Sequence, residues 1–242
     1  MKGIVLAGGL GSRLYPCTRV TNKHLLPVYD QPMIYYPLQT LAKAGCRQVM
    51  VVTGGENPGD FMRLIGDGKQ FGFDAVYYTY QHNPTGGIAD ALRLTRQFIG
   101  SDKFCVVLGD NLILDDVRAY VDDFKLKPLG SACVFIKEIE NPVAFGVAEV
   151  KGQMVTKIIE KPAVPATNLA VVGVYLYDGG VFDIIDKTRP SARGELEITT
   201  VNQVYADRGQ LGYYMLKEPW LDTGSFQSLA EAQRIIADRK SL

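Results

Sequence analysis

Two cationic side chains lie near a glycine-rich segment at the start of the chain. After an apolar stretch the chain reads Leu6-Ala7-Gly8-Gly9-Leu10-Gly11-Ser12-Arg13-Leu14, and Lys23 follows soon after. Glycines allow positive φ angles and let a ligand approach backbone N–H groups, a geometry that suits phosphate. Arginine binds phosphate through a planar fork and lysine as a point charge, so Arg13 and Lys23 could hold a triphosphate. An ordinary glycine turn with solvated cations is the alternative on this segment alone.

The spacing of these glycines excludes two common phosphate-binding motifs. No third glycine completes the dinucleotide fingerprint, and no Gly-Lys-Ser/Thr follows as it does in a Walker A loop. An oxidoreductase with a nucleotide cofactor is therefore not favoured.

Two aspartates far apart in the sequence are candidate metal ligands. Asp110 follows Phe104-Cys105-Val106-Val107-Leu108, which is apolar enough for a buried strand, so its carboxylate should emerge at the carboxyl end of a sheet. Asp222 lies in the short segment Trp220-Leu221-Asp222-Thr223-Gly224. One or two carboxylates, with substrate oxygens and waters, are the usual ligands of Mg²⁺. A turn or helix-cap aspartate is the alternative for each.

Three further polar residues follow expected strands. The Gln81 amide could hydrogen-bond a pyrimidine edge, with Gly86-Gly87 admitting the flat ring, although an exposed glutamine on a turn would look the same. Pro162 makes a stiff turn after Glu160 and Lys161. This turn would aim both side chains at a sugar phosphate, unless they form only a surface ion pair.

Composition excludes several other classes of function. The 242 residues carry 26 Lys and Arg against 26 Asp and Glu, without the basic excess of a nucleic-acid-binding protein. No apolar stretch is long enough to span a bilayer or to act as a secretory signal, so we expect a cytoplasmic protein without membrane contact. No CxxC pair indicates a zinc or redox site, and Cys105 and Cys133 should be buried thiols. His24 and His82 lack a nucleophile or metal partner, so we assign them no chemical step.

The elements that must position these residues begin with alternating strands and helices. Short β-branched runs predict strands at 3–7, 48–53, 75–79 and 104–108. Amphipathic stretches predict helices at 33–44, 59–65, 88–98 and 115–124, with Gly45, Gly66 and Gly100 placed to end three of them. This alternation is typical of a doubly wound α/β fold, which binds ligands beyond the carboxyl ends of its strands.

From residue 131 the pattern changes to closely spaced strands. We expect strands at 132–136, 146–150, 155–159 and 169–177, then helices at 181–187 and 196–208, a strand at 211–216 and a closing helix at 226–239. These strands predict a mixed sheet. No repeat, low-complexity tract or linker divides the chain, so we expect one domain over 1–242.

The chain resembles the sugar nucleotidylyltransferase family along essentially its whole length. The family signature GGxG(T/S)RLxPxTxxxxKxLLP is matched from Gly8 through Pro27, including Pro16, Thr18 and Lys23. Further family segments follow in order: Asp30-Gln31-Pro32-Met33-Ile34-Tyr35-Tyr36-Pro37, Leu108-Gly109-Asp110-Asn111, Glu160-Lys161-Pro162, and residues 190–199 and 220–224. The resemblance is closest to glucose-1-phosphate thymidylyltransferases.

The resemblance implies a single Rossmann-like α/β domain with a nucleotide-binding half at about 1–130 and a β-rich sugar-phosphate-binding half at about 131–242. The implied substrates are dTTP, or UTP, and α-D-glucose-1-phosphate, with Mg²⁺ held by Asp110 and Asp222. Implied catalytic residues are Arg13, Lys23 and Asp110. Implied nucleotide contacts are Leu6, Gly8, Gly9, Gly11, Ser12, Arg13, Lys23, Gln81, Gly87 and Asp110. Implied sugar-phosphate contacts are Asn111, Gly146, Glu160, Lys161, Val171, Tyr175, Arg193 and Trp220.

The implied reaction needs no side-chain base. A sugar phosphate has a second pKa of ~6, so it carries a nucleophilic oxyanion at neutral pH. Catalysis then consists mainly of aligning two polyanions and stabilising their charge. Another hexose-1-phosphate is an open alternative. A catalytically inactive subunit that senses nucleotide sugars is a second, although such modules usually lose the cations and carboxylates retained here.

Two departures from the family pattern carry expectations. Relatives commonly read Glu-Ile-Thr-Asp where this chain has Glu197-Ile198-Thr199-Thr200, so we expect a helix-cap or supporting effect at Thr200. The sequence ends at Leu242, short of the C-terminal extension that helps form a feedback site in longer relatives, which leaves feedback inhibition open.

Relatives are commonly homotetramers or dimers, so we expect a homo-oligomer with contacts near Tyr35 and Tyr36.

Overall fold

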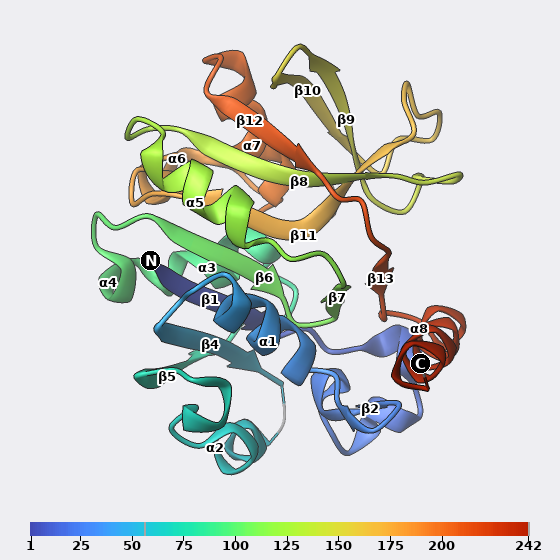
Figure 1. Cartoon of the computed structure of the whole chain (residues 1–242). Helices are drawn as coiled ribbons and strands as arrows, with labels where there is room; N and C mark the ends of the chain where they lie inside the picture. Colours follow the sequence, from blue (N-terminus) through green and yellow to red (C-terminus); the bar gives the residue numbers. More distant parts are fainter. Residues whose placement is uncertain (56, 242) are drawn as a thin grey trace.

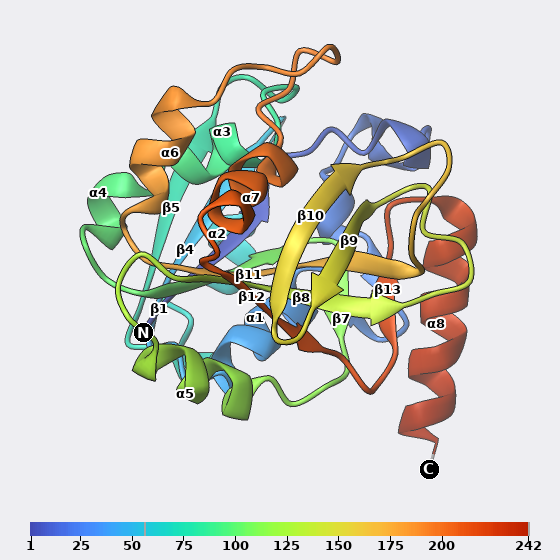
Figure 2. The same ribbon diagram turned by 90° about the horizontal axis from the view of Figure 1, so that it is seen from above.

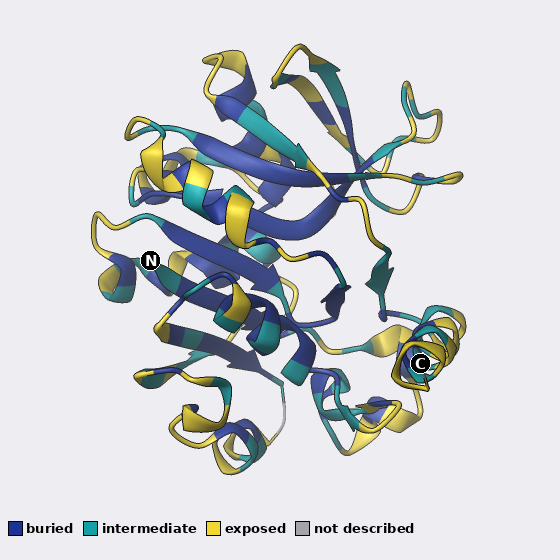
Figure 3. Cartoon of the chain, viewed as in Figure 1, coloured by how far each residue is buried: buried dark blue, intermediate teal, exposed yellow. Residues whose placement is uncertain are grey.

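A nine-stranded sheet connects both halves of the chain in the computed structural model, which describes residues 1–55 and 57–241. The strand order is β5-β4-β1-β6-β11-β8-β12-β10-β9 (Figure 1). The first half contributes four parallel strands: β5 (Ala75–Gln81), β4 (Gln48–Gly54), β1 (Lys2–Ala7) and β6 (Phe104–Leu108). Their apolar runs are continuous because helices cover both faces, and the central strands are buried along their length (Figure 3).

The second half extends the same sheet with mixed pairing. β11 (Leu169–Tyr177) lies antiparallel to both β6 and β8 (Ala132–Glu138), and β12 (Leu211–Met215) runs parallel to β8. β10 (Met154–Glu160) pairs antiparallel with β12 and with β9 (Gly146–Lys151). β9 also meets β11 at Val147 and Ala170. The predicted α/β class with a mixed sheet is therefore confirmed.

Helices cover the two faces of the sheet (Figure 2). Leu38 and Leu41 of α1 (Tyr35–Lys43) join one apolar cluster with buried side chains of α2 (Gly59–Ile65) and α5 (Arg118–Leu126). Those of α3 (Ile88–Arg93), α4 (Arg96–Ile99), α6 (Val181–Lys187) and α7 (Ile198–Asp207) join another. Among residues 1–55 and 57–241, no helix has both the length and the apolar character needed to cross a membrane.

The closing helix α8 (Phe226–Lys240) packs away from the main sheet, next to the small strands (Figure 1). Ala232 and Ile236 join a separate apolar cluster with Val28 of β2 (Pro27–Val28). The hairpin partner of β2 is β3 (Gln31–Pro32), and β13 (Trp220–Asp222) pairs antiparallel with β7 (Asn111–Ile113). A capping box between Ser225 and Ser228 fixes the start of α8 directly after the β13 segment.

Several local expectations are corrected by the structure. The helix expected at 88–98 is broken between α3 and α4, where the Thr95 hydroxyl donates to the Leu92 carbonyl at 2.8 Å. Four short 3₁₀ turns were also not predicted. Three follow the start of the glycine-rich loop, η1 (Ser12–Leu14), η2 (Cys17–Arg19) and η3 (Lys23–Leu25), and the fourth, η4 (Lys69–Phe71), lies before β5. The strands β2, β3, β7 and β13 were also not expected. Gly45, Gly66 and Gly100 have positive φ angles at helix ends, as predicted.

Two expectations about single residues are corrected in part, while a supporting effect of Thr200 and chain contacts near Tyr35 stay predictions. Thr200 is exposed within the first turn of α7 and Glu197 is the N-cap residue, so Thr200 does not cap this helix. Tyr36 is buried and donates its hydroxyl to the Val28 carbonyl at 2.9 Å, so its ring is not available for contact with a second chain. The homo-oligomer itself stays a prediction. Cys105 and Cys133 are buried free thiols, as expected.

Candidate active site

The carboxyl ends of β1 and β4 are held together by a buried asparagine. The Asn22 amide nitrogen donates to the carbonyls of Ala7 (3.2 Å) and Gly54 (3.3 Å). Its oxygen accepts from the backbone N–H of His24 at 3.0 Å. Lys23 lies between Asn22 and His24 in the sequence. The hydrogen bonds of Asn22 to the ends of β1 and β4 therefore fix the backbone from which the Lys23 side chain extends.

Lys23 forms a nearly buried ion pair with Asp110. Their Nζ and Oδ2 atoms are 2.5 Å apart, and the side chains are 13% and 12% exposed. The other oxygen of Asp110 accepts from the Asn111 amide at 3.0 Å. Burial alone would raise the pKa of Asp110, but the Lys23 ammonium and the hydrogen bonds outweigh burial and hold that pKa well below its usual range. Asp110 is therefore an ionised carboxylate at neutral pH.

The β13 segment brings Asp222 to the same place. Antiparallel pairing sets Asp222 opposite Asn111, and the backbone N–H and hydroxyl of Thr223 both donate to the Asp110 carbonyl, at 2.9 and 2.8 Å. Burial, and then the nearby Asp110 carboxylate, raise the pKa of Asp222 to about 6. The backbone N–H of Gly224 donates to Asp222 Oδ1 at 2.9 Å. Two carboxylates from distant parts of the sequence thus share one lysine.

This donor set fits a hard divalent cation. Mg²⁺ is usually held by one or two protein carboxylates, with phosphate and water oxygens completing its shell. Burial, and then the Asp110 carboxylate, raise the pKa of Asp222, so a cation bound between the two carboxylates would stabilise the ionised form of Asp222. Within the described part of the chain, no third His, Cys, Asp or Glu forms a metal-binding cluster with the pair. Substrate oxygens and water would have to supply the remaining ligands.

Arg13 approaches this cluster from the glycine-rich loop. Gly224 has no side chain to obstruct it, since a Cβ there would lie only 2.5 Å from the Arg13 Nη2. The same Cβ would lie 2.9 Å from Asp222 Oδ1. Arg13 Nη2 and Asp222 Oδ1 therefore both lie on the side of Gly224 where a side chain would project.

Two adjoining cavities open on either side of the cluster, and Arg13, Ile88 and Leu108 line both. The first, of about 390 Å³, is lined by nine of the ten predicted nucleotide contacts: Leu6, Gly9, Gly11, Ser12, Arg13, Lys23, Gln81, Gly87 and Asp110. The second, of about 330 Å³, is lined by Asp222 and by the predicted sugar-phosphate contacts Asn111, Gly146, Glu160, Lys161, Val171, Tyr175 and Trp220. Gly8 and Arg193 line neither cavity.

The two predicted residues outside the cavities touch residues within them. A Cβ on Gly8 would lie 2.6 Å from Gln81 Oε1. The Arg193 guanidinium lies 2.8 Å from Glu197 and 3.5 Å from Glu160. Arg193 therefore orients acidic side chains near the second cavity when no ligand is bound.

Hydrogen bonds fix the polar wall of the second cavity. Asn111 Oδ1 accepts from the Trp220 indole at 2.6 Å and from the Gly173 backbone at 3.0 Å. The Thr199 hydroxyl donates to Glu160, whose other oxygen lies 3.7 Å from Lys161 Nζ. Tyr175 is 4% exposed, and burial raises the pKa of its phenol, which therefore stays protonated.

Sequence reasoning missed four supporting residues. Asn22 joins two strands, Thr223 attaches β13 to Asp110, Thr199 orients Glu160, and His24 packs beside Gly109. Burial first, and then the Lys23 ammonium, lower the pKa of His24 to about 3, so its imidazole is neutral. The family segments contain all four, but no local pattern distinguishes these buried partners from surface residues.

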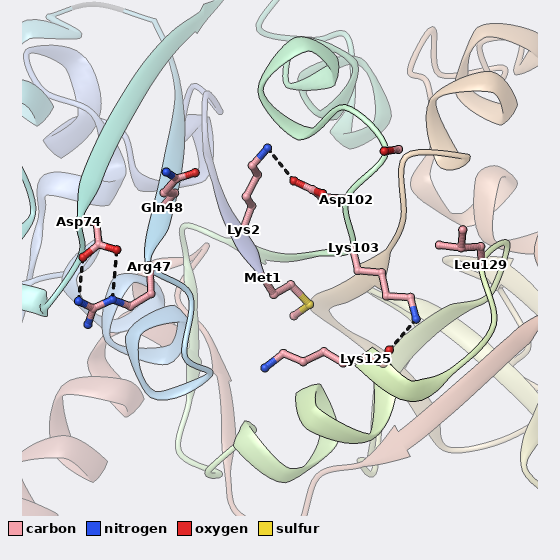
Figure 4. Close-up of a pocket in the computed structure, with 10 residues that line it drawn as sticks. Met1, Lys2, Arg47, Gln48, Asp74, Asp102, Lys103, Lys125 and Leu129 are labelled. Carbon is pink, nitrogen blue, oxygen red and sulfur yellow. Dashed lines mark hydrogen bonds and ion pairs between the residues drawn. The ribbon is translucent and has the colours of Figure 1, made fainter.

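A larger cavity lies elsewhere, at the amino ends of β1, β4 and β6 (Figure 4). It measures about 640 Å³, but its cations already have protein partners. Lys2 lies 2.8 Å from Asp102, Arg47 lies 2.7 Å from Asp74, and Lys103 donates to carbonyls at the end of α5. The unbalanced carboxylates and the glycine-rich loop are at the opposite end of the strands, which makes that end the candidate active site.

Comparisons with known proteins identify the family of this chain. A family model described as nucleotidyl transferase matches residues 2–239. Glucose-1-phosphate thymidylyltransferases from Neisseria meningitidis and Mycobacterium tuberculosis are each 43% identical to this chain, covering 98% and 96% of it and 82% and 81% of the relatives. A Bacillus anthracis structure assigned as glucose-1-phosphate thymidylyltransferase, in complex with sucrose, has a TM-score of 0.92 at 45% identity, covering 98% of this chain and 96% of the other. A UDP-glucose pyrophosphorylase complexed with UDP-glucose has a TM-score of 0.87 at 25% identity, covering 98% of each chain.

Proposed function

Because this chain belongs to the nucleotidyl transferase family, we propose that it transfers the nucleoside monophosphate unit of dTTP to α-D-glucose-1-phosphate, giving dTDP-glucose and pyrophosphate. The observation that carries this proposal is the position of the Lys23–Asp110–Asp222 cluster between two adjoining cavities. Asp110 lines the first cavity, Asp222 lines the second, and Arg13 lines both. A transfer reaction needs this arrangement, since donor and acceptor must meet at one phosphorus atom.

The chain's own residues align the two substrates. The sugar-phosphate oxyanion attacks the α-phosphorus of the nucleotide, a new P–O bond forms, and the bond to pyrophosphate breaks. In the first cavity, the glycine-rich loop and Lys23 bind the triphosphate, and Arg13 stabilises charge that grows toward the pyrophosphate. In the second, Lys161 binds the sugar phosphate, and Glu160 accepts hydrogen bonds from sugar hydroxyls. Arg193, which lies beside this cavity, orients Glu160. Gln81 contacts the base.

Asp110 and Asp222 would hold a divalent cation, and we propose Mg²⁺ because both ligands are hard oxygens. A bound ion supplies charge neutralisation between the carboxylates and the phosphates. Without it, the two carboxylates would repel the incoming substrates, because the nearby Lys23 and Arg13 do not lower the pKa of Asp222 as much as burial and Asp110 raise it.

A pyrophosphate-release assay tests the proposal. The purified protein with Mg²⁺ is offered dTTP, UTP, dCTP or dATP together with glucose-1-phosphate, galactose-1-phosphate or mannose-1-phosphate. We expect the fastest release with dTTP and glucose-1-phosphate. UTP should be a weaker or competing donor, because one methyl group contributes only about 1–3 kcal/mol of discrimination.

No sugar-dependent release with any pair would overturn the enzyme assignment. Binding of dTDP-glucose without turnover would then identify the chain as an inactive sensor of nucleotide sugars. Release that is faster with UTP or with another hexose phosphate would keep the reaction class and correct the substrate.

A further inference from the structure

Gln81 is a buried residue whose amide orientation is decided by its neighbours. It ends β5, is 5% exposed, and lines the first cavity. Its Nε2 lies 3.1 Å from Asp90 Oδ2 and 3.4 Å from the Gly87 carbonyl. A carboxylate and a carbonyl can only accept hydrogen bonds, so the group that faces them must be the NH₂ group. The amide oxygen therefore points away from Asp90, toward Gly8.

Asp90 is itself held in place. Its other oxygen accepts from the Arg93 guanidinium at 2.7 Å, and its side chain is 14% exposed, compared with 48% for Arg93. Gly86 leaves room for this carboxylate, since a Cβ there would come within 2.3 Å of Asp90 Oδ2. The Asp90 contact is shorter than the one to the Gly87 carbonyl and involves a charged acceptor, so it dominates the choice between the two amide orientations.

We propose that Asp90 is a positioning residue for base selection: it orients the Gln81 amide so that only an acceptor oxygen faces the base. This inference rests on the proposed function, because it names how the same site selects its nucleotide. Thymine and uracil carry a hydrogen-bond donor at ring nitrogen 3. Cytosine carries a lone pair there, which would face the Gln81 oxygen without a proton between them. Leaving a buried acceptor unpaired costs about 1–3 kcal/mol, so the selection should be measurable.

The test compares wild-type protein with Asp90→Asn and Asp90→Ala. An asparagine amide can present either NH₂ or oxygen to Gln81, and alanine presents neither, so both variants allow the Gln81 amide to turn over. We expect the ratio of kcat/KM for dTTP to kcat/KM for dCTP, both with glucose-1-phosphate, to fall by at least about 10-fold in each variant. The change should lie mainly in KM, because Asp90 does not touch the reacting phosphates.

Asp60→Asn is the matched control. Asp60 lies in the first turn of α2 and pairs with Arg63 three residues later, as Asp90 pairs with Arg93 in α3. The Asp60 carboxylate is not hydrogen-bonded to Gln81, as that of Asp90 is. Its variant should keep the wild-type ratio. The ratio is independent of how much of each preparation is folded, so partial unfolding cannot imitate the expected result. A ratio within about twofold of wild type in both Asp90 variants would overturn the inference.

Equilibrium binding separates this inference from the proposed function. If wild-type protein releases no pyrophosphate with any sugar, the proposed activity fails. Equilibrium dialysis of dTTP and dCTP in the presence of Mg²⁺ still measures the selectivity of the site. Wild-type preference for dTTP that is lost in both Asp90 variants supports the role of Asp90. Equal binding of the two nucleotides by the wild type, or a preference unchanged in the variants, refutes it.

Discussion

Lys23 Nζ lies 2.5 Å from Asp110 Oδ2, and neither side chain is more than 13% exposed. A buried pair of this kind loses hydration on both groups, so its net contribution to stability is small, whereas removing one partner leaves an uncompensated charge. In this protein a second carboxylate, that of Asp222, lies beside Asp110 and adds negative charge to the buried pair. The cluster is therefore better suited to binding a cation than to stabilising the ligand-free fold.

Lys23→Ala should destabilise the protein and make its stability depend on metal. With a chelator present, we expect the free energy of unfolding to fall by about 3–5 kcal/mol, because Asp110 stays buried without a partner. Added Mg²⁺ should restore part of this loss, since a cation replaces the missing ammonium. Urea denaturation with EDTA and with Mg²⁺ measures both effects.

Lys240→Ala provides the control for that experiment. Lys240 lies 2.7 Å from Asp30, almost as close as the buried pair, but the two side chains are 43% and 49% exposed. Its loss should cost less than about 1 kcal/mol. Equal stability of Lys23→Ala and wild type in EDTA would show that the ion pair is not isolated from solvent.

Asp222→Asn should stabilise the metal-free protein at neutral pH. The pKa of Asp222 is about 6 in the folded chain against a usual value of 3.8, so the folded state binds this proton more tightly. The contribution of Asp222 to the free energy of unfolding is therefore most favourable at low pH, and it declines as pH rises from about 4 to about 6. The variant avoids this decline and should gain up to about 3 kcal/mol at about pH 7.5, with no gain below about pH 4.

Chemical denaturation in EDTA across this pH range checks the Asp222 prediction. Mg²⁺ should stabilise wild type more than the variant, because one ligand of the ion is lost. A variant that is less stable than wild type at neutral pH without metal would contradict the raised pKa.

Much of the fold could be predicted from local sequence. The strands at 3–7, 48–53 and 104–108 are continuous apolar runs, and the structure buries them between helices within a residue of those bounds. The break between α3 and α4 was not visible, because the Thr95 hydroxyl that bonds Leu92 also fits a continuous helix in the sequence. The short strand β13 depends on its pairing with β7, a long-range contact that three residues cannot encode alone.

The candidate site was predictable in its members but not in its arrangement. The family signature identifies Arg13 and Lys23, and a later family segment identifies Asp110, whereas the meeting of Asp110 with Asp222 depends on tertiary pairing. The expected surface alternative for Gln81 is excluded by its burial at the end of β5. Residues that act through others, such as Asp90, have no sequence signal because an acidic residue in a first helical turn is common on surfaces.

Trp220→Phe should weaken binding of the sugar phosphate more than it slows turnover. The indole N–H donates to Asn111 Oδ1 at 2.6 Å, while the ring packs against Phe145 with centroids 4.7 Å apart. Phenylalanine keeps an aromatic surface but removes one of the hydrogen bonds that orient the Asn111 amide, leaving those with Gly173 and Asp110. We expect KM for glucose-1-phosphate to rise by about 5- to 10-fold, with kcat changed less and KM for dTTP unchanged. Steady-state kinetics with each substrate varied in turn would detect a uniform loss of kcat, which would contradict this role.

Gly224→Ala should displace Arg13 without unfolding the protein. An added Cβ would lie 2.5 Å from Arg13 Nη2 and 2.9 Å from Asp222 Oδ1, and the end of the long arginine side chain can move aside more easily than backbone. Arg13→Lys separates the two contacts, because it leaves Gly224 and Asp222 unchanged. If Arg13 stabilises charge on the departing pyrophosphate, kcat should fall by roughly 10²-fold, and Arg13→Lys should show a comparable loss because a single ammonium cannot replace the planar fork. The matched control is Gly59→Ala, where no atom lies within 4 Å of the new Cβ. Normal kcat in Gly224→Ala, with an unchanged melting temperature, would show that catalysis does not depend on the guanidinium position that the structure describes.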